Sequence, residues 1–233
     1  MNILTTGFNF SQDGPGNRLV IHTQGCNFHC PWCSNPESME ICTQRREMTP
    51  EEIVHLAKRS EMMFFSGGGV TFTGGEATLQ FDQLRQCLAL LREASIHTCL
   101  ETNGSHPRLT ELAPLIDYLI VDCKLADGER HRRYTGNDGE QTRENIRKLT
   151  QSGKDILVRI PLINHINTDP TPFVAFFNTC NRSHLQVEIL PYHEYGRDKW
   201  EKPYTVTDGF VSAAQIDAFA QALRADGIQL IQT

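Results

Sequence analysis

The sequence lacks several features that would indicate a membrane or nucleic-acid protein. No apolar run approaches the roughly 20 residues that a membrane-spanning helix needs. Residues 1–11 have neither the basic start nor the apolar core of a secretory signal, so we expect a cytoplasmic protein with no membrane contact. Basic residues are not in excess, since 22 Lys and Arg stand against 28 Asp and Glu and give a net charge of -6. Binding to phosphates usually needs a basic face, so nucleic acid is not expected as a partner.

The chain also lacks any sign of division into parts. No linker, internal repeat or low-complexity tract interrupts the 233 residues, and we expect a single domain over 1–233. Eight cysteines without an export signal indicate a reducing compartment, where clustered cysteines more often bind metal or do chemistry than form disulfides. Four of them have no partner spacing and are expected to be buried or surface thiols: Cys42, Cys87, Cys99 and Cys180.

A fourth thiol is missing where the cysteines do cluster. Cys26, Cys30 and Cys33 follow a C-x3-C-x2-C spacing. Soft thiolates select iron–sulfur clusters, zinc or copper. A structural zinc site takes four protein ligands, and an ordinary four-iron cluster takes four cysteines. The three thiols therefore leave one metal position open, or else His29 or a distant cysteine completes a zinc site.

Strands and helices are expected to alternate along the chain. The residue pattern predicts strands over 18–24, 70–73, 98–102, 118–122, 156–162, 185–190 and 228–231, and helices over 50–64, 81–94, 109–115, 137–151, 172–180 and 211–225. Residues 1–17 are expected to end in a turn-rich loop at 13–16. Alternation of this kind favours an α/β fold with a parallel sheet. Because the chain is short for eight units, we predict a partial (β/α)6 barrel.

Polar and glycine motifs follow the ends of the predicted strands. In chain order they are the cysteine loop, Gly74-Gly75-Glu76, Glu101-Thr102, Asp122-Cys123-Lys124 and His193. The carboxyl ends of parallel strands share one edge, where sites are built. Plainer interpretations remain open: a tight turn for the glycines, a core position for Trp32, helix caps or ion pairs for the acids, and a structural role for His193.

The cysteine spacing, with Trp32 just before the third cysteine, resembles the radical S-adenosylmethionine (SAM) enzymes. Longer segments narrow the resemblance to the activating enzymes of glycyl radical enzymes, and within them to the pyruvate formate-lyase type. These segments are residues 13–18, 24–33, 66–80, 96–104, 117–124 and 188–200, and they span nearly the whole chain. Only 40 residues separate Cys33 from Gly74, with Cys42 the one cysteine among them, so no ferredoxin-like insert is expected there.

The resemblance implies a role for each motif. Cys26, Cys30 and Cys33 would bind three irons of one [4Fe-4S] cluster, and SAM would chelate the fourth. The SAM contacts would come from Trp32, Cys33, Ser34, Gly74, Gly75, Glu76, Asp122, Cys123, Lys124 and His193. A monovalent cation, Na+ or K+, would lie at Glu101, Thr102 and Asp122, where Glu101 stands in place of the family's aspartate. Arg159 is a second-rank candidate to face the cofactor, and residues 13–18 would border the entrance of the protein substrate.

The resemblance also implies a reaction. Reductive cleavage of SAM at the cluster would give a 5′-deoxyadenosyl radical, which would abstract a hydrogen from a glycine Cα of a partner protein. The partner would be a glycyl radical enzyme, with flavodoxin or ferredoxin as electron donor, and the chain would act as a monomer under anaerobic conditions. Two alternatives remain: a small radical SAM enzyme acting on a small molecule, and a non-catalytic iron–sulfur or zinc protein.

Overall fold

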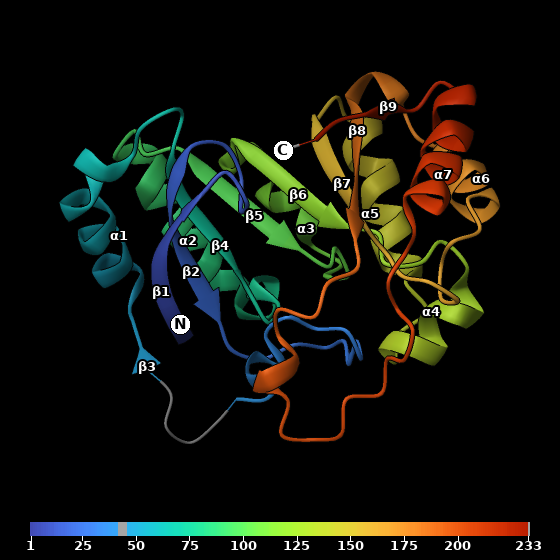
Figure 1. The fold of residues 1–233 in the computed structure, drawn as a ribbon. Helices are drawn as coiled ribbons and strands as arrows, with labels where there is room; N and C mark the ends of the chain where they lie inside the picture. The colour runs from blue at the N-terminus through green and yellow to red at the C-terminus, as the bar shows by residue number, and fades with distance from the viewer. Residues whose placement is uncertain (42–45, 233) are drawn as a thin grey trace.

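The computed structural model describes residues 1–41 and 46–232, so Cys42 lies outside the described residues. Within this part of the chain one sheet contains nine strands in the order β3-β1-β2-β4-β5-β6-β7-β8-β9 (Figure 1). Their bounds are β1 Asn2–Phe10, β2 Asn17–Thr23, β3 Arg46–Glu47, β4 Gly69–Gly74, β5 Thr98–Thr102, β6 Tyr118–Asp122, β7 Ile156–Leu162, β8 Leu185–Pro191 and β9 Gln229–Leu230.

The sheet is parallel from β2 through β9, while β1 pairs antiparallel with both β2 and β3. Its two ends do not meet, because β3 lies at one end of the strand order and β9 at the other. The predicted α/β partial barrel is therefore confirmed. The parallel strands are apolar over most of their length, as β2 and β7 illustrate, and such runs are typical of strands covered on both faces.

Helices connect the parallel strands and cover the outside of the sheet (Figure 1). The α-helices are α1 Pro50–Arg59, α2 Phe81–Glu93, α3 Leu109–Leu112, α4 Gly128–Thr135, α5 Glu140–Gln151, α6 Thr171–Phe177 and α7 Ala213–Ala225. Short 3₁₀ turns are η1 Pro36–Ser38, η2 Glu61–Met63, η3 Ala77–Gln80, η4 Ala113–Leu115, η5 Arg182–His184 and η6 Arg197–Lys199. In the described part of the chain, no helix is both long and apolar enough to cross a membrane.

Sequence patterns located most strands and α-helices but missed β1, the two-residue β3 and α4. The capping box at Thr49 starts α1 as predicted, although α1 ends at Arg59 and a separate 3₁₀ turn follows. The segment 2–10 was expected only to lead into a loop, and it forms β1 instead. The segment 128–135 carries no apolar stripe, yet Asp127 caps it and Gly136 ends it in the left-handed region, so it forms α4.

Most buried apolar side chains pack between the sheet and the helices outside it. Phe72 of β4 and Leu88 of α2 are fully buried there, together with Cys87 and Cys123. Cys99 is buried in a smaller cluster, and Cys180 is half-buried. The prediction that Cys87 and Cys99 are small buried residues is confirmed. The inner face of the sheet is where polar side chains gather, and these belong to the cavity described next.

Candidate active site

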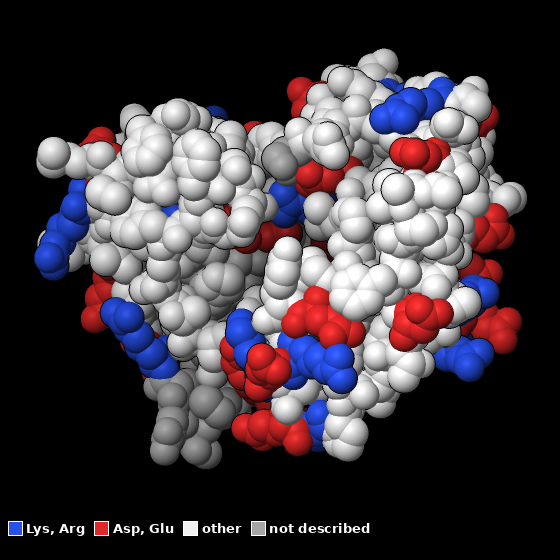
Figure 2. All heavy atoms as spheres, viewed as in Figure 1, with Lys and Arg blue, Asp and Glu red and all other residues white. Residues whose placement is uncertain are grey.

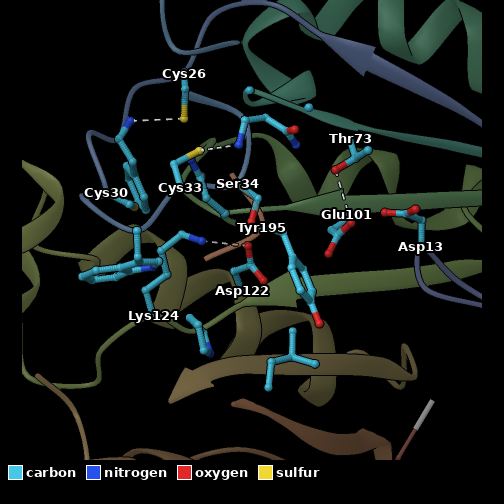
Figure 3. A pocket seen from close by; sticks show the side chains of 18 of the residues that line it. Asp13, Cys26, Cys30, Cys33, Ser34, Thr73, Glu101, Asp122, Lys124 and Tyr195 are labelled. Atoms are coloured by element: carbon cyan, nitrogen blue, oxygen red, sulfur yellow. Dashed lines mark hydrogen bonds and ion pairs between the residues drawn. The ribbon is translucent and has the colours of Figure 1, made fainter. Parts of the chain in front are cut away.

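A cavity of about 420 Å³ lies inside the open barrel. The cysteine loop borders it on one side, and the carboxyl ends of β4, β5, β6 and β8 and the β1–β2 loop border it elsewhere. Figure 3 shows the three cysteine side chains on one side and Glu101 and Asp13 across from them. Cavities that hold small ligands measure about 300–1,000 Å³, so this one has the size for a nucleoside-bearing cofactor.

The three clustered thiols all line this cavity. The backbone N–H of Phe28 donates to Cys26 Sγ and that of Asn35 donates to Cys33 Sγ, each over 3.4 Å. Such bonds to ligand sulfurs are among the means by which proteins tune iron–sulfur clusters. Burial raises the pKa of Cys26 to about 11 and that of Cys30 to about 12. The thiols stay protonated unless a cation compensates for their burial, and cluster irons would provide that charge.

The cysteine loop is supported from outside by α4. The backbone N–H of His29 donates to the Thr135 carbonyl over 2.9 Å, and the Phe28 ring meets His131 edge to face at 5.3 Å. His29 itself is exposed and does not line the cavity. Its position does not fit the zinc alternative in which His29 joins the three thiols. Among the described residues, no group of three or more His, Cys, Asp or Glu is arranged to hold a single metal ion.

The two glycines after β4 also line the cavity, and close packing of backbones explains them. A Cβ on Gly74 would come within 2.3 Å of the Thr23 nitrogen, and one on Gly75 within 2.3 Å of the Gly25 carbonyl oxygen. The turn after β4 thus lies directly against the start of the cysteine loop. The backbone N–H of Glu76 donates to Gly25 O over 2.7 Å and joins the two segments.

Glu76 is placed differently from the other predicted ligands. Its side chain is buried and does not line the cavity. The Glu76 carboxylate accepts hydrogen bonds from Thr78 N and Oγ1, from Thr102 Oγ1 and from Asn103 N. Burial raises the pKa of Glu76, and these donors act against that rise. The geometry makes Glu76 a link between the turns after β4 and β5, and it does not support direct contact with a bound ammonium.

Lys124 and Asp122 form an ion pair at the end of β6, with Nζ and Oδ2 2.9 Å apart (Figure 3). Both residues line the cavity. Burial opposes the charge on Lys124, but Asp122 and the nearby Cys30 and Cys33 outweigh it and raise the pKa of Lys124. An ammonium can donate three hydrogen bonds, so one to Asp122 leaves capacity for a ligand. Cys123, between them, is buried in the core and does not line the cavity.

Glu101 lines the cavity and pairs with the buried Arg159. Its Oε1 is 2.8 Å from Arg159 Nη1, and its Oε2 accepts from Thr73 Oγ1 over 3.2 Å. Arg159 also pairs with Glu188 at 2.8 Å and donates to the Gln12 carbonyl at 2.8 Å. Burial raises the pKa of Glu101 to about 7, although Arg159 lowers it. Arg159 does not line the cavity, so this second-rank candidate holds the wall in place rather than facing the ligand.

Comparison with known proteins identifies the family. The model of the Radical SAM superfamily matches residues 20–176. A pyruvate formate-lyase-activating enzyme of Staphylococcus aureus is 34% identical over 201 residues, which cover 81% of this chain and 80% of that enzyme. The chain belongs to the radical SAM activating enzymes. It is thus an oxidoreductase of the pyruvate formate-lyase-activating type, as the sequence motifs predict.

Solved structures agree with this assignment. A domain of a pyruvate-formate lyase-activating enzyme from Bacteroides vulgatus superposes with a TM-score of 0.58 at 27% identity, covering 71% of this chain and 98% of that one. A radical SAM methyltransferase from Sphaerobacter thermophilus gives a TM-score of 0.71 over 97% of this chain and 68% of that one. At 18% identity the second comparison supports a shared fold and nothing more specific.

Two ring nitrogens beside the cavity of this radical SAM enzyme have no hydrogen-bond partner among the described residues, as a site for a polar ligand would require. Trp32 Nε1 and His22 Nδ1 are buried without a hydrogen-bond partner in the structure, and both residues line the cavity. Trp32 is also packed among Phe28, Leu125 and other apolar side chains. It is therefore a core aromatic on one side and a cavity wall on the other, which suits the stacking and hydrogen bonding of an adenine.

The segment that follows β8 crosses over the cysteine loop of the activating enzyme. Trp200 Nε1 donates to the Cys33 carbonyl over 3.1 Å, and Gly196 lies so close to Ser34 that a Cβ would meet the Ser34 carbonyl oxygen at 2.4 Å. His193 and Ser34 both line the cavity. Nδ1 of His193 accepts from the Tyr195 N–H over 3.4 Å, and burial lowers the pKa of His193. A neutral ring in this tautomer has its Nε2–H available for a ligand.

Sequence reasoning missed several cavity residues of this radical SAM site. They come from β1, the β1–β2 loop, β2 and the segment after β8: Asn9, Gln12, His22, Tyr192 and Tyr195. For His22 a signal exists, since it interrupts the apolar run of β2. Asn9 could be placed at the cavity only if residues 2–10 were predicted as a strand.

Proposed function

We propose that this enzyme activates a partner glycyl radical enzyme, with pyruvate formate-lyase as the first candidate. The observation that carries the proposal is the sharing of one cavity by three cysteine thiols and the Asp122–Lys124 pair. Identity to the pyruvate formate-lyase-activating enzyme of S. aureus supports the choice of partner. A flavodoxin or ferredoxin would donate electrons, and we expect a monomer working in the cytoplasm.

The cavity residues fit one [4Fe-4S] cluster and SAM. Cys26, Cys30 and Cys33 would hold the cluster. Burial raises the pKa of these thiols, so they would ionise only beside a positive charge such as that of the cluster irons. When bound, the two groups supply one-electron cleavage of SAM and a 5′-deoxyadenosyl radical that takes a hydrogen atom from a glycine Cα. The chain itself supplies binding, orientation and exclusion of water for this chemistry.

Several residues around the cavity would each hold a different part of SAM. Lys124, kept charged by Asp122, would bind the methionine carboxylate. Trp32 would stack on the adenine and donate its unpartnered Nε1–H, and His193 would donate Nε2–H to the ribose. Gly74 and Gly75 would present backbone to the methionine amino group, while Glu76 keeps their turn against the neighbouring segment.

Glu101 would contribute to a monovalent cation site beside SAM. Its carboxylate lines the cavity near Thr102 and Asp122, which line it too. Burial with acidic neighbours holds the pKa of Glu101 at about 7, so a cation placed beside it would favour the ionised form. Na+ or K+ would suit an oxygen-only donor set of this kind.

The test is anaerobic reconstitution followed by two assays. We expect about four irons per chain, in keeping with one four-iron cluster. Reduction with SAM should release 5′-deoxyadenosine, and electron paramagnetic resonance should detect a glycyl radical on pyruvate formate-lyase. Binding of one zinc with no cleavage of SAM would refute the enzymatic function. Cleavage of SAM without a radical on any glycyl radical enzyme would instead favour a small-molecule substrate.

A further inference from the structure

Exposed apolar side chains gather on the outer face of β1 and the turn after η2. Phe8 and Phe10 are 46% and 55% exposed, and Phe65 is 52% exposed. The rings of Phe10 and Phe65 stack with their centroids 5.8 Å apart. Met62 and Met63 of η2 are exposed as well. We call Phe8, Phe10, Met62, Met63 and Phe65 the β1 patch, and Figure 2 shows its region, at the upper left, as mostly free of charge.

The β1 patch is held in a fixed shape. The Asn17 backbone N–H donates to the Phe65 carbonyl over 3.1 Å, and Asn17 Nδ2 donates to the Met63 carbonyl over 2.8 Å. A Cβ on Gly16 would meet the Phe65 carbonyl oxygen at 2.4 Å, so the two segments are in close backbone contact. A rigid apolar surface loses little entropy when it binds a partner.

The strand beneath the patch has an unprotected edge. β3 pairs with β1 only at Asn2 and Ile3, and in the described part of the chain no strand pairs with the rest of that edge. Proteins normally shield such edges with charge, proline or a covering segment. Here β1 instead carries two exposed phenylalanines. The space beside Gly7, in the same strand, is open, because an added Cβ would meet nothing within 4 Å. Both features favour contact with another protein.

The same strand also borders the cavity, and this position favours a partner that must reach the cavity. Asn9 lies between Phe8 and Phe10 and lines the cavity, because side chains of a strand alternate between its faces. Phe10 pairs with Asn17, at the opposite end of β2 from the cysteine loop, and the length of β2 separates them by about 20 Å. An electron donor must approach the cysteine loop. A protein that inserts a loop into the cavity would instead rest on the edge of the sheet at β1, and Phe8 and Phe10, on the face of β1 opposite Asn9, would lie at the margin of that contact.

We propose that the β1 patch docks the glycyl radical enzyme while its glycine loop occupies the cavity. The proposal rests on the proposed function and adds the surface that selects the intact protein. The patch would contribute to affinity for the folded partner but not to reactions within the cavity. A short peptide copying the glycine loop would not reach the patch.

The test compares the wild type with Phe8→Ser/Phe10→Ser, using pyruvate formate-lyase and its glycine-loop peptide as substrates. We expect the KM for the intact protein to rise about tenfold, as for loss of two apolar anchors, with no change in 5′-deoxyadenosine formed with the peptide. Phe210→Leu is the control, because Phe210 is 59% exposed outside the patch and leucine keeps an apolar contact with the neighbouring Tyr192 ring, so its KM should equal that of the wild type.

Other outcomes would overturn the inference in different ways. An unchanged KM for the intact protein in the double variant, with an active wild type, refutes the patch and leaves the proposed function standing. A wild type that forms no glycyl radical refutes the function and the inference together. Sedimentation that finds a wild-type dimer and a monomeric double variant, with equal KM values, would assign the patch to a second copy of this chain.

Discussion

Arg159 provides the sharpest stability prediction. It is 4% exposed and its guanidinium reaches Glu101, Glu188 and the Gln12 carbonyl, each over 2.8 Å. Arg159→Met fills similar space but removes the positive charge from two buried carboxylates. Breaking a buried ion pair from one side costs about 3–5 kcal/mol, and we expect a loss of this size in the free energy of unfolding.

The loss should depend on pH in a defined direction. The pKa of Glu101 is raised from 4.5 to about 7 in the fold, so the folded chain holds a proton that the unfolded chain releases. The free energy of unfolding of the wild type therefore falls as the pH rises from about 4.5 to about 7. Without Arg159 the pKa of Glu101 rises further, and the deficit of the variant should grow between pH 7 and pH 8 by up to about 1 kcal/mol, since the wild type itself loses part of the roughly 1.4 kcal/mol that one pH unit can contribute.

Equilibrium unfolding of the cluster-free protein in urea, under reducing conditions, measures both effects. Arg159→Met/Glu188→Gln is the matched variant, because it also removes one of the two buried carboxylate charges that Arg159 contacts, and it should recover part of the loss. The free energy of unfolding of Arg159→Lys should lie between those of Arg159→Met and the wild type, since one ammonium cannot reproduce the three contacts of a guanidinium. A loss below about 1 kcal/mol, or one independent of pH, would refute the view that this buried cluster stabilises the cavity wall.

The remaining predictions address the site itself. Cys30→Ala should abolish the cluster, measured by iron content and absorbance, together with cleavage of SAM; retained activity would contradict its assignment as a ligand. Gly75→Ala should lower iron incorporation, since the methyl group would displace Gly25 beside the cysteine loop. Lys124→Met should raise the KM for SAM about tenfold or more while Lys124→Arg keeps part of the affinity, and equal values for both would argue against a carboxylate contact.

The sequence predicted the parallel part of the fold well, because buried strands and capped helices have local signatures. β2 and β4 to β8 lie within a residue or two of their predicted positions. β1 was missed because most of its side chains are not buried and its pairing with β2 decides its structure. α4 was missed because its residues are charged and its stability comes from its caps and its contact with the cysteine loop.

The site was predictable where residue type sets the chemistry, and less so where packing decides. Three thiols, an Asp–Lys pair and a histidine at strand ends meet at one cavity as expected. Glu76 and Cys123 belong to the same motifs, yet their side chains turn away from it.

Glu76 shows how a motif residue can shape a site without lining its cavity. The Glu76 carboxylate joins Thr102 and Asn103 at the end of β5 to the turn after β4, while the Glu76 N–H reaches Gly25. One residue, through its side chain and its backbone N–H, thus joins three of the segments that surround the cavity. Its replacement by glutamine would introduce an amide where four donors now converge on a carboxylate, and the cavity would lose its shape before it lost any ligand contact.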